Sequence, residues 1–429
     1  MTRKTWLIIL FALLVLCVLA TTCGLGAYLA SEYLRATPDV TPQASGSAAP
    51  RPTTRPAEEG ASPSGTLRLS GGTPPTLDPA LVQDSTSAEY VVHLFSGLVT
   101  LDQDLEVVPD LAARWDLSED GRTYTFHLRP DATFQDGRAL TAEDVAYSIE
   151  RACSPETGSP VAGSYLDDIV GATARTRGEA EFVTGVVVVD DHTLRITVDA
   201  PKAYFLAKLT YPVAFVVDRQ QIEADGAGWV RQPNGSGPFV LASMSRELIA
   251  LEANERYYGV APSVRRVEYV LSGGQPLAMY ENDELDIAQV SPAEIERVTD
   301  PENPLSRELV TGSEPSVQYL GFNVAMPPFD DRAVRQAFAH AIDRAKIADL
   351  VLRGTATEAK GILPPAMPDF DPTLEGLAYD PERARALLAS SRYGAEGAMP
   401  PIVLTVSGTS GYLSSIDRAI LSMLEENLG

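Results

Sequence analysis

Two segments of the sequence, residues 134–151 and 328–344, each predict a turn followed by a capped amphipathic helix. In the first segment, Asp136 and Gly137 are typical of a tight turn. Thr141 is expected to cap the following helix, with Asp144 at its third position. Apolar residues recur on one face of this helix, at Ala142, Val145, Ala146 and Ile149. A helix with such a stripe must pack against a core, so the segment is scaffold.

The second segment follows the same logic. Asp331 is expected to cap a helix, and Asp343 is expected to cap the next turn and helix, which ends near Gly354. The buried face of the first of these helices is predicted to consist of Val334, Ala337, Phe338, Ala341 and Ile342. Both segments therefore identify a fold and are not expected to touch a ligand.

Length and charge narrow the class of protein. A chain of 429 residues is too long for one compact core, so two or three domains are expected. The net charge of −24 and the absence of a Lys/Arg cluster exclude nucleic acid as a partner. Cys17 and Cys23 lie in the apolar N-terminal segment, which leaves Cys153 alone in the folded part. An internal disulfide or a cysteine metal site is therefore not expected there.

The N-terminus predicts export. Arg3 and Lys4 precede a stretch without charge from Trp6 to Ala30, which is long enough to cross a bilayer. We expect residues 1–35 to form a membrane anchor with the folded part outside the membrane, although a cleaved signal with lipidation at Cys23 is the alternative. Residues 36–64 are rich in Pro, Ala and Ser and predict a disordered spacer.

The remainder of the chain predicts an α/β fold. Alternation of apolar and polar residues at 123–128 indicates a half-buried strand, and residues 185–198 predict a hairpin that turns at Asp190 and Asp191. Further strands are expected at 65–70, 317–323 and 402–406, and further helices at 379–388 and 414–428. The last of these helices should turn Ile416, Ile420, Met423 and Leu424 inward.

Residues 134–151 and 328–344 together resemble segments of the bacterial extracellular solute-binding proteins of family 5, which supply peptides or nickel chelates to ABC importers. The similarity includes Leu77–Pro79, Phe95–Leu98, 235–240 and 251–258, and it covers residues 65–429. It implies a type II periplasmic-binding-protein-like fold of three lobes, with mixed sheets flanked by helices and a ligand cleft that closes about a hinge. Relatives continue for about another hundred residues, so the chain is expected to be truncated at its C-terminus.

The resemblance also implies domain boundaries. The first domain is expected to be discontinuous, from 65–105 and 205–312, with crossings near residues 105 and 205. Residues 106–204 would form the second domain. Residues 313–429 would form an incomplete third domain.

Candidate ligand-binding residues follow from the resemblance alone. Residues just beyond Pro79, namely Gln83, Asp84 and Ser85, are expected to face the ligand. The loop 159–165 is expected to approach the ligand backbone, although Val161 stands where some relatives carry an aromatic residue. The resemblance implies further ligand contacts at Val161, Ser164, Tyr165, Asn323, Ser410 and Tyr412.

The sequence does not predict catalysis, a cofactor or a metal site. His93, His127, His192 and His340 stand in different segments without ligand spacing, and Ser236 lacks the Gly-x-Ser-x-Gly context of a nucleophile elbow. The resemblance implies a monomeric binding protein that delivers extracellular oligopeptides or dipeptides to an ABC permease. The alternatives are a binder of nickel chelates or other small solutes, and a peptide-sensing co-receptor.

Overall fold

The computed structural model describes residues 65–367, 369–395, 399–406 and 413–429. All of them belong to one compact unit of the chain, Ala61–Gly429. The predicted anchor at 1–35 and the predicted spacer at 36–64 lie outside the described residues. Among the helices of the described ranges, none is both long enough and apolar enough to cross a bilayer.

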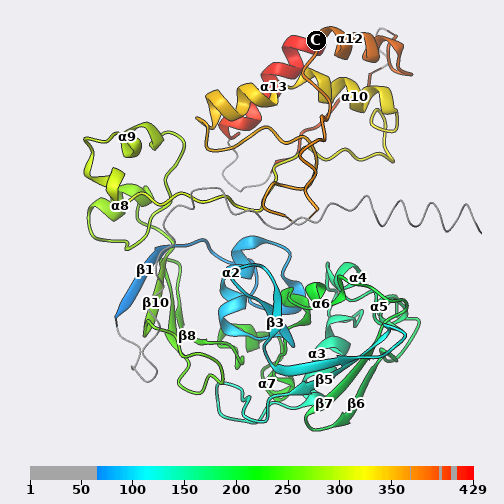
Figure 1. The fold of residues 1–429 in the computed structure, drawn as a ribbon, viewed down its shortest axis with the longest axis vertical. Helices are drawn as coiled ribbons and strands as arrows, with labels where there is room; N and C mark the ends of the chain where they lie inside the picture. Colours follow the sequence, from blue (N-terminus) through cyan, green and yellow to red (C-terminus); the bar gives the residue numbers. More distant parts are fainter. Residues whose placement is uncertain (1–64, 368, 396–398, 407–412) are drawn as a thin grey trace, which may run out of the picture. The chain divides into compact units, whose positions relative to one another are not determined.

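A mixed four-stranded sheet is built from two distant parts of the sequence. Its strand order is β1-β10-β9-β8, and β1 runs parallel to β10 while the other pairs are antiparallel (Figure 1). The predicted strand at 65–70 is thereby confirmed as β1. The four strands are β1 Thr66–Ser70, β8 Phe239–Met244, β9 Leu248–Ala253 and β10 Arg266–Val270.

Helix α2 (Ser85–Leu94) packs on this sheet through apolar residues at helical spacing. Tyr90 and Leu94 are buried, and the Tyr90 ring meets the Tyr269 ring of β10 edge-on at a centroid distance of 4.8 Å. Trp229 joins the same hydrophobic cluster. It comes from the group of short helices that precede β8, which are α6 Phe205–Lys208, η2 Pro212–Ala214, α7 Arg219–Asp225 and η3 Gly226–Arg231.

A second, antiparallel sheet is formed by the chain between β1 and β8. Its order is β4-β5-β7-β6, and the central strand β5 buries Tyr124, Phe126 and Leu128, as predicted from its alternation. The predicted hairpin is confirmed as β6 and β7, but its turn lies at Asp191 and His192, one residue later than expected. The strands are β4 Ala112–Leu117, β5 Thr123–Leu128, β6 Val186–Asp190 and β7 Thr193–Thr197.

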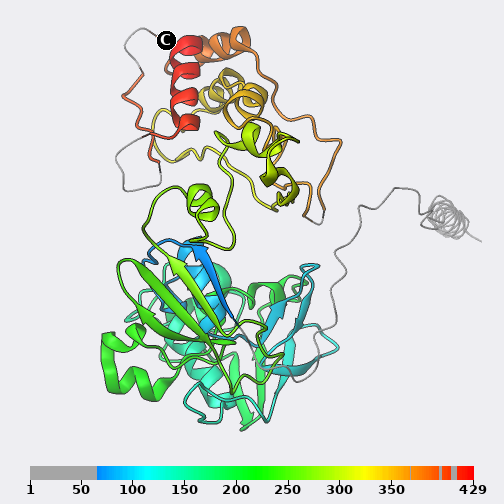
Figure 2. The ribbon, with the colours of Figure 1, turned by 90° about the vertical axis from the view of Figure 1, so that its left-hand side faces the viewer.

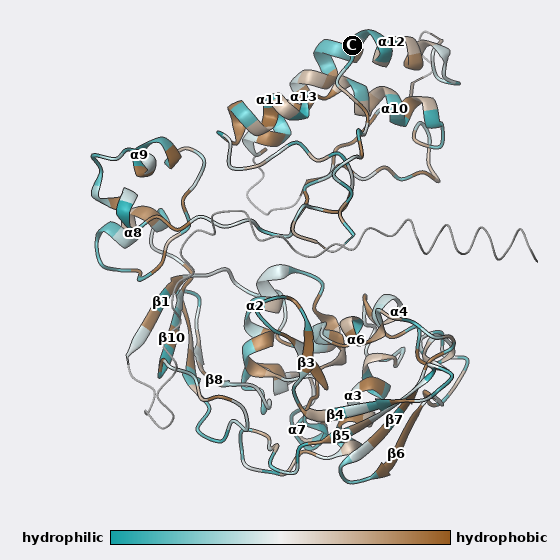
Figure 3. Ribbon diagram, in the orientation of Figure 1, coloured by the Kyte–Doolittle hydropathy of each residue, from teal (hydrophilic) through white to brown (hydrophobic). Residues whose placement is uncertain are grey.

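Helix α3 (Ala142–Ala152) covers this second sheet near β6 and β7 (Figure 1). Its predicted capping residues are confirmed, because the Asp144 carboxylate accepts hydrogen bonds from the Thr141 N–H and hydroxyl at 2.9 and 3.0 Å. Figure 3 shows the hydrophobic colour of the valine-rich strand β6 in this layer. The other elements of this part are η1 Pro79–Leu81, β2 Val99–Leu101, β3 Val107–Pro109, α4 Ala162–Tyr165 and α5 Ala172–Thr176.

The C-terminal part of the described chain is helical. Asp331 caps α10 by accepting a hydrogen bond from Ala333 N at 2.8 Å, and all five residues of its predicted apolar face are buried. Figure 2 shows α13 in red beside α12 in orange. The helices are α10 Arg332–Ala341, α11 Arg344–Lys346, the π-helical turn η5 Ile347–Val351, α12 Pro381–Ser390 and α13 Ser415–Leu428. Three short helices come before them, α8 Pro276–Glu281, α9 Ile295–Thr299 and η4 Pro304–Arg307.

Two predicted strands in this part are wrong. Residues 317–323 and 402–406 form no strand, and Tyr319 and Val403 are 73% and 83% exposed. A strand exists only when a neighbouring backbone accepts and donates its hydrogen bonds. In the described part of the chain neither segment has such a neighbour, so a strong apolar pattern alone does not produce a strand.

Candidate ligand-binding site

The first predicted ligand segment lies between two helix caps. Upstream, the Asp78 carboxylate caps η1 by accepting from Ala80 N at 3.0 Å. Downstream, the Asp84 carboxylate caps α2 by accepting from Ser87 N at 2.8 Å. Gln83 and Ser85 are exposed and Asp84 is half-buried. The Asp84 carboxylate is thus a helix cap in the structure, its ligand contact stays a prediction, and Gln83 faces solvent.

The backbone is extended on both sides of Gln83. Val82 has φ −67° and ψ 122°, and Asp84 has φ −132° and ψ 154°. Among the described residues, the main-chain N–H and C=O of Gln83 have no hydrogen-bond partner. A short extended backbone with free hydrogen-bonding groups can pair with another extended chain.

The second predicted segment, the loop 159–165, contains the short helix α4. The Ser159 hydroxyl accepts a hydrogen bond from Ala162 N at 3.1 Å and so fixes the start of this helix. Val161 is half-buried against the hydrophobic cluster of the second sheet, whereas Ser164 is exposed. Of the residues predicted here, Ser164 is therefore more accessible than Val161.

Tyr211, which sequence reasoning missed, connects these two segments. Its ring stacks on the Tyr165 ring at a centroid distance of 3.9 Å and an interplanar angle of 14°. Its hydroxyl donates to the carbonyl oxygen of Val82 at 3.4 Å. Tyr211 lies in the segment that returns from the second sheet toward the first, and no periodicity in the sequence marks it. The structure therefore brings Gln83–Ser85 and Ser164–Tyr165 together through a residue far from both in sequence.

The electrostatic surroundings keep this tyrosine protonated. Burial raises the pKa of Tyr211, and Tyr165 and the Asp84 carboxylate raise it further. The hydroxyl therefore stays protonated to a higher pH than an ordinary tyrosine hydroxyl does.

A lysine and aspartate cluster braces the tyrosine pair. Asp168 is buried and accepts hydrogen bonds from Lys202 and, at 2.6 Å, from Lys208. Burial favours a higher pKa for Asp168, but the hydrogen bonds from the two lysines outweigh burial and lower its pKa. Lys208 also binds Asp167 at 2.7 Å. The chain just after Tyr165 is thereby fastened to the chain just before Tyr211.

Three further ion pairs, made by Arg151 and Arg138, join the layers of this part of the chain. Arg151 on α3 binds the Asp78 carboxylate with both terminal nitrogens, at 2.9 and 2.5 Å. Arg138 binds Asp144 at 3.0 Å and Asp218 at 2.8 Å. Bidentate and buried pairs of this kind fix geometry more strictly than exposed ones. Asp78, which lies upstream of the predicted segment Gln83–Ser85, is therefore anchored to helix α3.

The other predicted ligand residues are not brought to this place. Asn323 is exposed, and its side-chain oxygen accepts a hydrogen bond from Ala325 N at 3.2 Å. Within the described ranges, no hydrogen bond or ion pair joins Asn323 to Gln83–Ser85 or to Ser164–Tyr165. Ser410 and Tyr412 lie outside the described residues.

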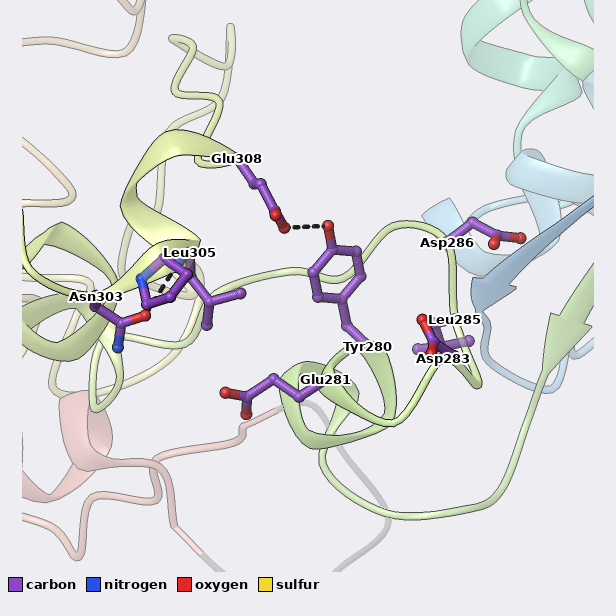
Figure 4. A pocket seen from close by; sticks show the side chains of 9 residues that line it. Tyr280, Glu281, Asp283, Leu285, Asp286, Asn303, Leu305 and Glu308 are labelled. Carbon is purple, nitrogen blue, oxygen red and sulfur yellow. Dashed lines mark hydrogen bonds between the residues drawn. The ribbon is translucent and has the colours of Figure 1, made fainter.

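A separate hollow of about 570 Å³ lies between α8 and η4. Figure 4 shows the hydrogen bond from the Tyr280 hydroxyl to Glu308, which measures 2.6 Å, at this hollow. None of the predicted ligand residues lines it, and two of its carboxylates, Glu281 and Asp286, are already paired with Arg297 and Arg68. Its lining consists of Tyr280, Glu281, Asp283, Leu285, Asp286, Asn303, Pro304, Leu305 and Glu308. We therefore place the candidate site at the tyrosine pair.

The Gly235–Ser236–Gly237 motif has a packing role. A Cβ atom on Gly235 would lie 1.9 Å from the carbonyl oxygen of Leu94, so only glycine fits where these backbones cross. Ser236 is completely buried, which is unsuitable for a nucleophile that must reach a substrate.

Burial raises the pKa of the Cys153 thiol to about 12. In the part of the chain that the structure describes, no three His, Cys, Asp or Glu side chains are grouped to hold a metal ion.

Comparison with known proteins gives one consistent family. The family model described as bacterial extracellular solute-binding proteins, family 5, middle, matches residues 106–429. The chain is 35% identical over 336 residues to the "Probable deoxycholate-binding periplasmic protein YgiS" of Escherichia coli (strain K12), covering 75% of this chain and 62% of that protein. It is 31% identical over 337 residues to the dipeptide-binding protein of the same organism, covering 74% of this chain and 62% of that protein. The chain thus spans 62% of the length of these two relatives.

The fold comparison agrees. The structure of the Escherichia coli murein tripeptide binding protein MppA superposes with a TM-score of 0.72 at 28% sequence identity. That similarity covers 85% of this chain and 73% of the other. The predicted periplasmic-binding-protein-like α/β fold is thereby confirmed.

Proposed function

This chain belongs to family 5 of the bacterial extracellular solute-binding proteins, and from that membership we propose that it captures extracellular peptides for an ABC importer. Proteins of this family are binding components of transporters and not enzymes. In the proposed role, the chain binds oligopeptides or dipeptides as a monomer without consuming them and presents them to a membrane permease.

One observation carries the choice of peptide. The extended backbone at Val82–Asp84 leaves the N–H and C=O of Gln83 free among the described residues. Main-chain hydrogen bonds to an extended peptide provide affinity without depending on its side chains. The dipeptide-binding and murein tripeptide-binding relatives support the same ligand class.

We propose that the ligand contacts are shared between domains. The proposed first domain comprises 65–105 and 205–312 and provides Gln83, Asp84 and Ser85. The second, 106–204, provides Val161, Ser164 and Tyr165. The third, 313–429, provides Asn323, Ser410 and Tyr412. Each of the two four-stranded sheets has all of its strands within one of the first two ranges, which supports these ranges, while the β2–β3 pair joins them across residue 105.

We propose that residues 1–35 tether the protein at the membrane and that 36–64 act as a spacer, with the folded part on the outer side. The uncharged stretch from Trp6 to Ala30 after Arg3 and Lys4 supports this orientation. A tether keeps the captured ligand close to a permease.

A second candidate ligand is an amphipathic steroid such as deoxycholate. The relative with 35% identity carries that ligand in its name, and the stacked Tyr165 and Tyr211 offer a half-buried aromatic face. Aromatic rings with polar edges suit a ligand that is apolar on one side.

Calorimetric titration of the full chain in a nonionic detergent tests these alternatives. The ligands would be alanine peptides of two to five residues, deoxycholate, and nickel with a histidine chelator. One-to-one binding of a peptide at micromolar or lower concentration supports the proposal. Binding of deoxycholate alone would transfer the assignment to the second candidate, and binding of the nickel complex alone would make the chain a metal-chelate receptor.

A further inference from the structure

The Val82–Gln83 peptide group is held from one side only. Its carbonyl oxygen accepts the hydrogen bond from the Tyr211 hydroxyl at 3.4 Å. Its N–H, which belongs to Gln83, has no partner among the described residues. Because a peptide unit is planar and trans, its C=O and N–H point in opposite directions. Holding the carbonyl toward Tyr211 therefore turns the Gln83 N–H away from it.

Tyr211 itself is fixed well enough to act in this way. Its ring is stacked on Tyr165, and it is half-buried against the hydrophobic cluster of the second sheet. Asp168, bound by Lys202 and Lys208, fastens the chain on both sides of the pair. A hydroxyl on a packed ring loses little conformational freedom when it forms its hydrogen bond.

The neighbouring caps do not replace this contact. Asp78 holds Ala80 upstream and Asp84 holds Ser87 downstream, but neither binds the Val82–Gln83 peptide group. The Val82 side chain is fully buried and fixes the position of its Cα, whereas rotation about ψ still changes the direction of the peptide plane. In the described structure, Tyr211 is the side chain that sets this direction.

We propose that Tyr211 is a positioning residue that presents the Gln83 N–H to a main-chain carbonyl of the bound peptide. This inference deepens the proposed peptide-binding function and rests on it. By orienting the Gln83 N–H, Tyr211 selects an extended ligand that has a main-chain carbonyl acceptor. The residue itself acts through Gln83 and need not touch the ligand.

The first measurement needs no ligand. Selective ¹⁵N-glutamine labelling of the full chain gives the relaxation of the Gln83 amide in the wild-type protein and in Tyr211→Phe, which keeps the ring and removes the hydroxyl. We expect the order parameter of the Gln83 amide to be lower in Tyr211→Phe than in the wild-type protein, where a rigid backbone amide has a value of about 0.85. Tyr204→Phe is the matched control, because Tyr204 is 55% exposed and lies outside the tyrosine pair. An unchanged Gln83 amide in Tyr211→Phe would overturn the inference.

The second measurement is a double-mutant cycle with the tightest-binding alanine peptide. Tyr211→Phe is expected to weaken binding roughly 3- to 10-fold, the range of one hydrogen bond, with a melting temperature equal to that of Tyr204→Phe. In a Gln83→Pro background, which lacks the N–H, the same change should cost nothing. An equal loss in both backgrounds would show a merely structural role and refute the proposal. If the wild-type chain binds no peptide, the proposed function fails, whereas the relaxation of Gln83 still decides whether Tyr211 orients it.

Discussion

Replacing Asp218 with alanine should destabilise the protein far more than a typical loss of charge. The Asp218 carboxylate accepts from Arg138 at 2.8 Å, from Gln220 N at 2.9 Å and from the Asn234 amide at 2.6 Å. Its side chain is 4% exposed, and that of Arg138 is 24% exposed. The substitution therefore removes a helix cap and one partner of a largely buried ion pair together.

The magnitude follows from these two losses. Removing the cap of α7 costs about 1 kcal/mol. Breaking a fully buried pair costs about 3–5 kcal/mol, but Arg138 keeps Asp144 at 3.0 Å and is partly exposed, so about 2 kcal/mol is expected here. The sum of about 3 kcal/mol corresponds to a fall in melting temperature of about 6–12 °C.

Thermal unfolding of the full chain, followed by circular dichroism, measures this effect. Glu223→Ala on the same helix is the control, because its pair with Arg219 is exposed at 59% and 60% and is expected to contribute less than about 1 kcal/mol. Arg138→Ala completes a double-mutant cycle, in which a coupling of about 2 kcal/mol is expected. A shift for Asp218→Ala no larger than that for Glu223→Ala, or additive effects in the cycle, would refute the reasoning.

Three further predictions test other parts of the structure. Gln83→Pro removes one main-chain donor and should weaken peptide binding, measured by calorimetry, about 10-fold. The control is Arg332→Pro, at the exposed first position of α10, which should leave the affinity unchanged. Equal losses of affinity in the two variants would contradict this prediction. Burial raises the pKa of Asp110, so the folded state holds its proton where the unfolded state has lost it. The stability of the wild type relative to Asp110→Asn should therefore fall as the pH rises above the ordinary aspartate pKa, and it should level off above the raised pKa. Melting curves of both proteins from pH 4 to 8 measure this difference in stability. A difference that stays constant or rises with pH would disprove the prediction. Gly235→Ala places a Cβ 1.9 Å from the carbonyl oxygen of Leu94 in α2 and should lower the free energy of unfolding by about 3 kcal/mol. The control is Gly228→Ala, whose added Cβ meets no atom within 4 Å. Similar melting temperatures for the two variants would be inconsistent with the packing.

The sequence predicted those parts of the fold whose causes are local. Thr141 and Asp144, or Asp331 and the helix that it caps, are a few residues apart, so the sequence contains the whole interaction. The β6–β7 hairpin was found for the same reason, because its two strands and turn are contiguous. In each case the short sequence separation makes the pattern sufficient.

Interactions between distant residues were not predictable in this way. Residues 402–406 have the composition of a strand, yet in the described part of the chain nothing pairs with them. Tyr211 carries no signal of its own, because its stacking on Tyr165 depends on how the chain returns from the second sheet. Tertiary packing decides such cases, and the sequence pattern is compatible with several outcomes.

The parallel pairing of β1 with β10 has a consequence for the order of folding. Thr66 pairs with Arg266, and these residue numbers differ by 200. At about 5–20 residues per second, synthesis of the intervening chain takes roughly 10–40 s, during which β1 has no partner. The antiparallel strands β8, β9 and β10 are close in sequence and can assemble as soon as they emerge, so β1 joins a sheet that already exists. Until then, the start of the folded region must be kept from pairing with other chains.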